Sequence, residues 1–343
     1  MRFRPCTALL TLALGAALCF SCKKEEEESS VNAFSGTLTF NMPEYVAYGQ
    51  VFHLVPGGVS RTDDTPDQIG YSYEETLTGA SGTLRAEADP LSKTAEFDFE
   101  ISKDTVGTFT FTYYAFADGY AKRSAARTFY VVNPVLETGS LSGLNLPAAA
   151  YIFTDARDGQ QYPALDIDGT SWMLRNLAYA GDGTLGTPYA GAELMSEIYG
   201  RYYTWTEATT ASPCPAGWRL PTDADWVAIG RKYGSDPSVS SPETAPGAGP
   251  ALMSDASFNR ERMWARPSAS ITGESGLCCI PTGYALASDG GFSDTATGGF
   301  AVFWTADDSG GLGLSRYVNY NGDGLYTSLH DKNDFACTIR CVK

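Results

Sequence analysis

An alternation of apolar and polar side chains at residues 95–101 constrains the fold more than any other feature of this 343-residue sequence. Acidic residues separate Ala95, Phe97, Phe99 and Ile101 from one another. Successive side chains of a β-strand point to opposite faces of the sheet, so such a segment buries one face and exposes the other to water. The same alternation surrounds Phe109. Both segments therefore predict half-buried strands.

Residues 35–133 contain seven strand-like runs and no stretch with the period of a helix. The runs are Gly36–Asn41, Tyr45–Val55, Gln68–Leu77, Gly82–Glu87, Thr94–Ile101, Val106–Phe116 and Tyr120–Val132. Seven short strands separated by turn signals such as Asp118-Gly119 are typical of an all-β immunoglobulin-like sandwich. The segment has no cysteine, and its pattern is similar to the small immunoglobulin-like modules of bacterial surface proteins. Another all-β sandwich of similar size fits the same pattern.

Asn133-Pro134 ends this pattern, and the composition then changes. Residues 134–152 are rich in Gly, Ser, Leu and Pro, which is typical of a linker or of a first strand that docks on the next domain. All six tryptophans follow residue 170. We therefore predict a second domain with its own core over residues 153–343, which a chain of this length can support.

The first 21 residues have the pattern of a lipoprotein signal peptide. Arg2 and Arg4 precede an apolar stretch, Ala8–Phe20, that is shorter than the ~20 residues of a membrane-spanning helix. The sequence from Leu18 to Cys22 is similar to the lipobox of bacterial lipoproteins, so Cys22 is the predicted lipidation site. The alternative is an ordinary cleaved signal followed by an incidental cysteine. Because no later segment is apolar enough to span a membrane, the acyl chains on this cysteine would be the sole anchor.

Residues 22–34 follow as a charged tether. Lys23-Lys24 and the four glutamates at residues 25–28 cannot bury apolar area, so they predict a solvated stalk. The run is similar to the acidic export signal of Bacteroidetes surface lipoproteins, which implies an outer-membrane lipoprotein that faces the cell exterior. The net charge of −16 becomes −18 when Arg2 and Arg4 are removed. Phosphate backbones repel so acidic a protein, which argues against nucleic acid as a partner.

Four motifs follow one another within the second domain. They are the segments 155–159, 171–179, 199–205 and 214–222, and the chain closes on Arg340-Cys341-Val342-Lys343. The third motif reads Tyr-Gly-Arg-Tyr-Tyr-Thr-Trp, and the fourth reads Cys-Pro-Ala-Gly-Trp-Arg-Leu-Pro-Thr. The ordered set resembles the Fibrobacter succinogenes major paralogous domain (FISUMP), a family of exported proteins, over residues 153–343. Leu174-Arg175 and the extra cysteines depart from the family pattern.

The resemblance implies an α+β domain similar to the C-type-lectin-like fold, in which a cysteine near the first helix is tied to the last strand. We accordingly expect a disulfide between Cys214 and Cys341, which would contribute about 4–5 kcal/mol to stability. Cys337 is expected to pair with Cys278 or Cys279, and the alternative is that it is a buried free thiol. An exported protein favours disulfides over metal ligation by these cysteines.

A helix is expected directly after the fourth motif. Thr222 can cap its N-terminus, and Asp223 and Asp225 fall in the first turn, where negative charge is favourable. Trp226 and Ile229 would lie on its buried stripe.

No arrangement of residues typical of an enzyme is visible. His53 and His330 are the only histidines, and they fall in different predicted domains. No serine-hydrolase elbow, zinc-protease motif or phosphate-binding glycine loop is present, and no two carboxylates are marked out as a glycosidase pair. Residues 319–330 begin like a calcium loop but end on His330 instead of a bidentate glutamate, which favours a hairpin turn at Asp323-Gly324. We expect no enzymatic activity, no cofactor and no metal.

Aromatic side chains are the candidate ligand contacts. Trp264 and Trp304 lie in glycine-rich surroundings, and one of them with Tyr317 or Tyr320 would form a stacking platform for sugar. The expected function is that of a surface-anchored lipoprotein whose lectin-like domain binds a glycan or another surface protein. The alternatives are an envelope protein with no ligand and an enzyme that acts on polysaccharide through carboxylates not yet located.

Overall fold

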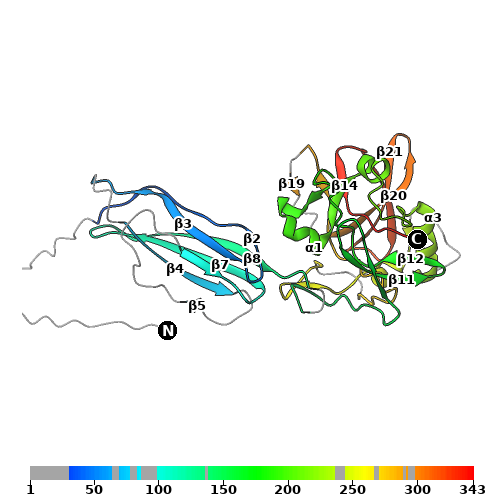
Figure 1. Ribbon diagram of the computed structural model, residues 1–343, viewed down its shortest axis with the longest axis horizontal. Helices are drawn as coiled ribbons and strands as arrows, with labels where there is room; N and C mark the ends of the chain where they lie inside the picture. The colour runs from blue at the N-terminus through cyan, green and yellow to red at the C-terminus, as the bar shows by residue number, and fades with distance from the viewer. Residues whose placement is uncertain are drawn as a thin grey trace, which may run out of the picture.

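The computed structural model places the chain in two domains joined near residue 133 (Figure 1). It describes residues 31–63, 69–77, 83–85, 99–135, 138–235, 244–265, 270–288, 291–292 and 298–343. The predicted signal peptide (residues 1–21), Cys22 and most of the tether lie outside these ranges, as do residues 95–98 of the alternating segment.

Each of the seven runs predicted in the first domain overlaps a strand, and the run at residues 45–55 overlaps two, the second of which continues to Ser60. The strands are β1 (Ser35–Asn41), β2 (Tyr45–Ala47), β3 (Val51–Ser60), β4 (Gly70–Leu77), β5 (Thr83–Arg85), β6 (Phe99–Ser102), β7 (Gly107–Phe116) and β8 (Arg123–Val132). They form a three-stranded sheet in the order β1-β3-β6 and a five-stranded sheet in the order β2-β8-β7-β4-β5. The pairing of β2 with β8 is parallel, and the other pairings are antiparallel.

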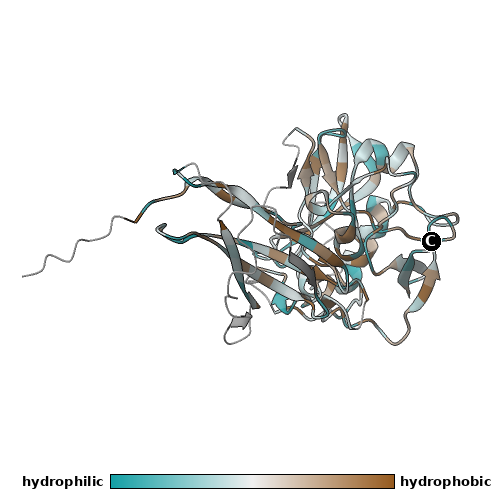
Figure 2. Ribbon diagram, turned by 60° about the vertical axis from the view of Figure 1, so that its left-hand side comes forward, coloured by the Kyte–Doolittle hydropathy of each residue, from teal (hydrophilic) through white to brown (hydrophobic). Residues whose placement is uncertain are grey.

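A single core lies between the two sheets of the first domain. Along β7, Phe109, Phe111 and Tyr113 are buried, and the residues between them are half-buried. Phe129 of β8 packs on both phenylalanines, with ring centroids 5.2 Å apart in each pair. Leu54 of β3 joins the same cluster from the other sheet, and apolar residues recur along these strands (Figure 2). Since burying one such side chain stabilises the fold by about 1.5–3 kcal/mol, the alternation in the sequence itself supplies this core.

The second domain combines many short strands with a few helices. Its strands are β9 (Leu141–Ser142), β10 (Tyr151–Thr154), β11 (Gln161–Ile167), β12 (Thr170–Met173), β13 (Thr187–Pro188), β14 (Arg201–Thr204), β15 (Thr244–Ala245), β16 (Ser257–Phe258), β17 (Glu261–Arg262), β18 (Ala285–Leu286), β19 (Gly291–Phe292), β20 (Phe300–Ser309), β21 (Leu312–Asn319), β22 (Leu325–His330) and β23 (Phe335–Cys337). Its helices are α1 (Ser196–Tyr199), α2 (Trp205–Thr210), α3 (Asp223–Tyr233) and α4 (Ala248–Leu252), with 3₁₀ turns η1 (Tyr189–Gly191) and η2 (Glu193–Met195). The sheets have the orders β10-β11-β12, β13-β14-β23-β18-β19, β15-β22-β21-β20 and β17-β16-β9.

Helix α3 confirms the prediction made for the end of the fourth motif. The Thr222 hydroxyl accepts from the Asp225 backbone N–H at 3.3 Å, and the Asp225 carboxylate accepts from the Thr222 N–H at 2.7 Å. Trp226 and Ile229 are buried, and the Trp226 ring packs against Trp172 at 4.8 Å. This helix therefore packs its own tryptophan on the tryptophan of the second motif in the core.

Residues 134–152 attach the first domain closely to the second. Of the two possibilities raised for this segment, a linker or a docking strand, the structure contains a docking strand at residues 141–142. Leu141 and Ser142 form β9, which pairs with β16, and Leu141 is buried. Ahead of it, the Ser140 N–H donates to Asn133 O at 2.7 Å. The chain is thus held by backbone hydrogen bonds within a few residues of the end of β8.

Two of the five cysteines beyond the predicted anchor form a disulfide. Cys214, ahead of α3, is bonded to Cys341, as predicted. Cys278, Cys279 and Cys337 are free and buried, so the prediction that Cys337 pairs with Cys278 or Cys279 is wrong. The three thiols are enclosed in three different clusters of core side chains. Burial raises the pKa of Cys278 to about 11 and that of Cys279 to about 12, so both remain unreactive thiols near neutral pH.

Aromatic side chains connect the two domains. Tyr45 of β2 stacks on Tyr130 of β8 at 5.1 Å and meets Tyr189 of the second domain edge-on at 6.4 Å. Phe258 of β16 lies 6.4 Å from Tyr130 and 6.3 Å from Tyr199. We call these five rings the aromatic junction. Because large rings bury extensive area with few rotatable bonds, they favour one relative placement of the domains.

Candidate functional site

The sequence motifs of the second domain meet in its interior. Asn176, from the second motif, donates its side-chain amide to Tyr199 O of the third motif at 2.8 Å. Its carbonyl oxygen accepts from Arg340 Nε at 2.6 Å. Gly200 has a φ of 78° and lies so close that a Cβ added there would come within 2.5 Å of the Asn176 Cβ, which only glycine permits. These motif residues hold the core together.

Arg157 joins the first motif to the loop ahead of the fourth. Its guanidinium binds the buried Asp155 carboxylate and donates to Pro213 O at 2.7 Å, while lying 3.6 Å from the centroid of the Tyr179 ring. Burial alone would raise the pKa of Asp155, but the hydrogen bonds from Arg157 bring this pKa below its ordinary value. The pair is thus an ionised structural contact with its hydrogen bonds satisfied.

Arg340 is buried among neutral acceptors. Besides Asn176, it donates to the backbone carbonyls of Met173 at 3.3 Å and Cys278 at 3.0 Å, and to that of Leu277. Burial lowers its pKa from the ordinary arginine value. A buried cation is costly unless its donors are satisfied, and here the backbone satisfies them. Arg340 therefore links the C-terminal segment to the loop that carries Cys278.

Trp264 and Trp304 are not ligand contacts, so that prediction is wrong. Their side chains are 2% and 0% exposed. The Trp264 indole N–H donates to Ser254 O at 3.0 Å, and that of Trp304 donates to Tyr203 O at 2.7 Å. Both rings therefore fill the core.

Tyr317 does line a hollow, at the sheet formed by β20, β21 and β22. Its volume is about 390 Å³, within the range of small-molecule sites. The lining side chains are almost all aromatic or aliphatic, and we call this hollow the aromatic groove: Tyr284, Leu286, Phe300, Val302, Tyr317, Ser328, His330 and Phe335. Only Tyr317 was identified from the sequence as a possible ligand contact.

The rings of the aromatic groove support one another. Tyr317 stacks at 5.4 Å on Tyr326, its partner across the β21–β22 ladder, and meets Phe300 edge-on at 6.0 Å. His330 stacks on Phe335 with centroids 3.7 Å apart. Burial lowers the pKa of His330 to about 4, so its imidazole is neutral near pH 7 and contributes no charge to the groove.

Tyr320, the other tyrosine predicted to contact a ligand, packs beside the core cluster that contains Trp226 and is not among the residues that line the groove. The turn between β21 and β22 spans residues 320–324, which confirms the hairpin predicted at Asp323-Gly324.

Among the described residues, no group of three or more His, Cys, Asp or Glu side chains is placed to hold a metal ion.

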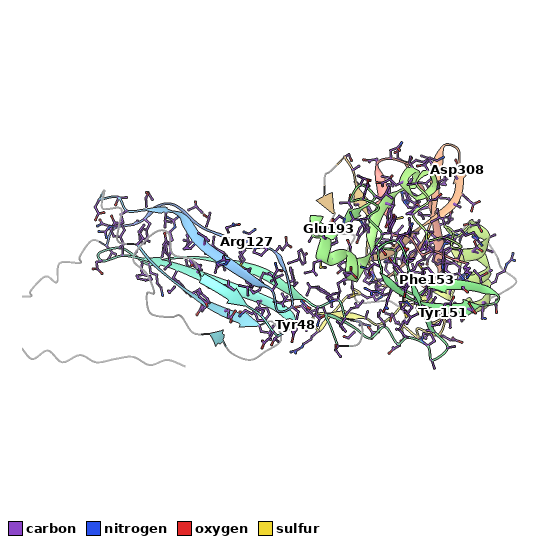
Figure 3. The ribbon with its side chains drawn as sticks, viewed as in Figure 1. Tyr48, Arg127, Tyr151, Phe153, Glu193 and Asp308 are labelled. Atoms are coloured by element: carbon purple, nitrogen blue, oxygen red, sulfur yellow. A yellow bond between two sulfur atoms is a disulfide. The ribbon has the colours of Figure 1, made fainter. Side chains whose placement is uncertain are left out.

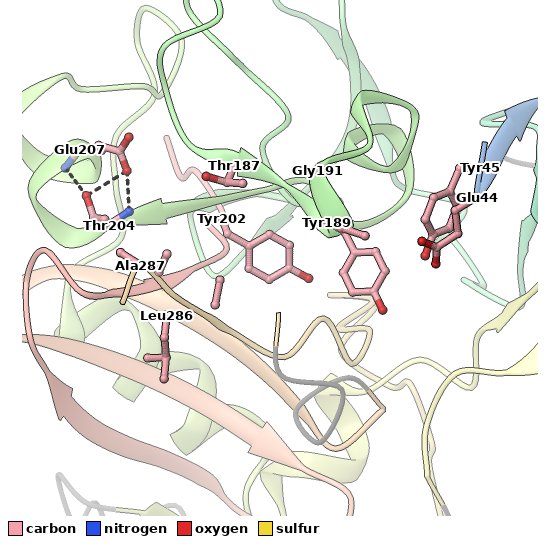
Figure 4. Close-up of a pocket in the computed structure, with 13 residues that line it drawn as sticks. Glu44, Tyr45, Thr187, Tyr189, Gly191, Tyr202, Thr204, Glu207, Leu286 and Ala287 are labelled. Carbon is pink, nitrogen blue, oxygen red and sulfur yellow. Dashed lines mark hydrogen bonds between the residues drawn. The ribbon is translucent and has the colours of Figure 1, made fainter. Parts of the chain in front are cut away.

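A larger cavity, of about 640 Å³, lies between the two domains (Figure 4). We call it the junction cleft. The first domain contributes Glu44 and Tyr45, and the second contributes further polar side chains together with small residues such as Ala285. The polar side chains from the second domain are Thr187, Tyr189, Tyr202, Thr204 and Glu207. None of the described lining residues is basic.

Glu207 is held in place at one end of the junction cleft. Its carboxylate accepts from the Thr204 N–H at 2.7 Å, from the Thr204 hydroxyl at 2.9 Å and from the Gly186 N–H at 3.1 Å. Glu44 lies at the opposite end of the view, with Tyr189 and Tyr202 between the two carboxylates (Figure 4). No sequence pattern predicts this cavity, because its lining comes from both domains.

The charged surface of the second domain shows paired side chains. Glu193 lies on the side that faces the first domain, and Asp308 lies at the top of the view, by the hairpin of β20 and β21 (Figure 3). Glu193 is bound to Arg201 at 2.6 Å, and Asp308 is bound to Lys332.

Within the described part of the chain, no helix has both the length and the apolar composition to cross a membrane.

Comparisons with known proteins identify the family of the second domain but not an activity. The family model described as the Fibrobacter succinogenes major domain matches residues 165–343, more than half of the chain. No curated protein matches. Among solved structures, the superoxide reductase (neelaredoxin) of Ignicoccus hospitalis is 15% identical, with a TM-score of 0.22, over 28% of this chain and 80% of that one. Two variants of the same enzyme are 16% identical over the same shares, with TM-scores of 0.21. Scores this low support neither a shared fold nor a shared activity.

Proposed function

The chain belongs to the Fibrobacter succinogenes major domain family, and we propose that it is a surface-anchored lipoprotein that binds a glycan through the aromatic groove. The observation that carries the proposal is the groove itself. Five aromatic rings line it (those of Tyr284, Phe300, Tyr317, His330 and Phe335), and its volume is about 390 Å³. The C–H faces of a pyranose ring are apolar and stack on aromatic rings, while its hydroxyl groups point outward to polar partners. Ser328 and the neutral His330 are such partners.

The charge of the molecule favours a neutral glycan. No basic side chain lines the groove among the described residues, and the whole chain carries a net charge of −16. An anionic polysaccharide would approach against this field and find no cation to bind. We therefore propose a neutral glycan rather than a sulfated or uronic one.

For the two domains we propose an immunoglobulin-like sandwich followed by a lectin-like domain. Two sheets around one core support the first assignment. The bond from Cys214, ahead of α3, to Cys341 near the C-terminus supports the second. In this arrangement the first domain extends the binding domain away from the membrane.

The anchor we propose is lipid on Cys22, in the outer membrane, with the protein facing the cell exterior. Changing Cys22 to Ser in the native host removes the acylated sulfur, so the protein should leave the membrane fraction. Protease treatment of intact cells tests the exterior location, because only an exposed protein is degraded. Membrane partitioning that the serine variant leaves unchanged would contradict the anchor.

Glycan binding is tested with the mature chain on an array of neutral and acidic glycans. Tyr317→Leu removes one stacking ring and keeps an apolar side chain, so affinity should fall about fivefold to tenfold. Tyr320→Leu is the matched control, because this ring lies on the same hairpin but outside the groove. Equal losses in the two variants would contradict a site in the groove.

The same experiment separates the alternative functions. An array on which nothing binds would favour an envelope protein with no ligand. Release of reducing ends from a bound polysaccharide would instead show an enzyme. The carboxylates nearest the bound sugar would then be the first candidates for substitution by the corresponding amides.

A further inference from the structure

The junction cleft has the chemistry of a saccharide site that uses both domains. Its polar side chains include two carboxylates, two threonine hydroxyls and the ring and hydroxyl of Tyr189. Carboxylate oxygens have lone pairs for several donors, so Glu207 can accept from a ligand hydroxyl beyond its bonds to Thr204 and Gly186. Paired hydroxyl groups of a sugar are donors of this kind.

The cleft is already formed without a ligand. The stack of Tyr45 on Tyr130 and the edge contact of Tyr45 with Tyr189 set one wall against the other. Binding there would not require the domains to close, so little ordering free energy would be lost. A cavity of about 640 Å³ is large enough for more than one sugar ring.

The cleft and the aromatic groove are neighbours at one pair of strands. Ala285 pairs with Ala336 and Leu286 pairs with Phe335 between β18 and β23. The two alanines line the cleft, Phe335 lines the groove, and Leu286 borders both. Two saccharide sites that share a lining residue are close enough for one polymer to reach both.

We propose that the junction cleft is a second saccharide-binding site, so that the ligand is a neutral polysaccharide whose repeating units occupy the cleft and the groove together. This inference rests on the proposed function of the groove. It makes the first domain part of the binding site, through Glu44 and Tyr45, as well as a spacer. Simultaneous occupation raises the affinity for a polymer above that of either site alone.

The test compares polymer with short oligosaccharide on the mature chain. The probes are xyloglucan, galactomannan and amylose, with polygalacturonate as the anionic comparison. Whichever neutral polymer binds is also tested as its two- and three-unit fragments. Glu44→Ala and Tyr189→Leu should weaken the polymer about tenfold or more through loss of the second contact. Binding of the short fragments in the groove should change little.

Glu274→Ala is the matched control, because it removes the same charge from an exposed position outside the cleft. The Glu44 side chain is exposed, so its replacement leaves the fold intact even if the Tyr189 change does not. If Glu44→Ala and Tyr189→Leu bind polymer like the unchanged protein while Tyr317→Leu does not, the second site is overturned and the proposed function stands. If no neutral polysaccharide binds at all, the proposed function is overturned and the second site with it.

Discussion

The two domains reach a buried β-rich core by different routes. In the first domain, strands of up to ten residues pair along their length, and one cluster of rings fills the space between two sheets. In the second domain many strands have only two to four residues, and three clusters share the interior. Local alternation specifies the first domain, whereas contacts between distant segments specify the second. A substitution that removes contacts in one domain should therefore destabilise that domain and leave the stability of the other unchanged.

The largest difference between the domains is expected when the Cys214–Cys341 bond is removed. It joins residues 127 positions apart, and loss of such a loop closure should cost about 4–5 kcal/mol in the chain-entropy model. Replacing both cysteines by alanine should therefore destabilise the second domain and leave the first unchanged. Urea unfolding followed by tryptophan fluorescence reports on the second domain alone, because all six tryptophans lie there. Hydrogen exchange of β7 amides reports on the first, and an equal loss there would contradict the separation.

The converse change removes a ring from the core of the first domain. Phe129→Ala deletes contacts to Phe109 and Phe111 at a fully buried position, so the free energy of unfolding should fall by about 3–4 kcal/mol. Hydrogen exchange in β4 and β7 should accelerate, while the tryptophan-detected transition keeps its midpoint. A shifted tryptophan transition would show that the aromatic junction couples the domains in stability.

Arg340→Met tests whether single long-range contacts hold the second domain. It leaves the oxygen of Asn176 and the backbone carbonyls that Arg340 binds without donors in a buried place, so we expect a loss of about 2–3 kcal/mol. Arg340→Lys keeps the charge but not the planar guanidinium, so it should recover only part of the lost free energy of unfolding. Tryptophan-detected urea unfolding measures both. Full recovery by lysine would mean that charge, rather than geometry, is what the site requires.

The smallest effect is expected at the cap of α3. The hydrogen bonds from Arg219 and Thr222 lower the pKa of Asp225 against the opposing effect of burial. A carboxyl with a lowered folded-state pKa contributes stability above its ordinary value, near pH 4, and loses it as the pH falls through the folded-state pKa. Asp225→Asn should therefore cost about 1 kcal/mol at pH 7, and this difference should shrink in acid. A difference in urea stability independent of pH would contradict an ionised cap.

The sequence was sufficient where neighbouring residues determine the structure. The period of two around Phe109 and Phe111 placed β7 to within one residue of its observed start, and Thr222 with Asp225 placed the start of α3. The Cys214–Cys341 bond came from the family resemblance and not from any local pattern.

The sequence failed where residues distant in the chain meet. The glycine-rich surroundings of Trp264 and Trp304 predict exposed rings. Both rings are buried instead, and their indole N–H groups donate to the backbone carbonyls of residues 254 and 203. Cys337 was assigned a partner because an exported protein favours disulfides, but the packing encloses each remaining thiol separately. One signal near the aromatic groove was available: the predicted hairpin joins β21, which carries Tyr317, to β22, which carries Ser328 and His330.

The parallel pairing of β2 with β8 has a mechanical consequence. Tyr45, Val46 and Ala47 lie beside Tyr130, Val131 and Val132 at the junction end of the first domain. If the chain is held at its N-terminal side and pulled through a polymer bound to the second domain, the load passes from β1 to β2 and leaves the first domain through β8. It then acts along the strands and strains their hydrogen bonds all at once, as in shear, instead of opening them one by one. This short strand pair is where the first domain would resist being stretched by flow.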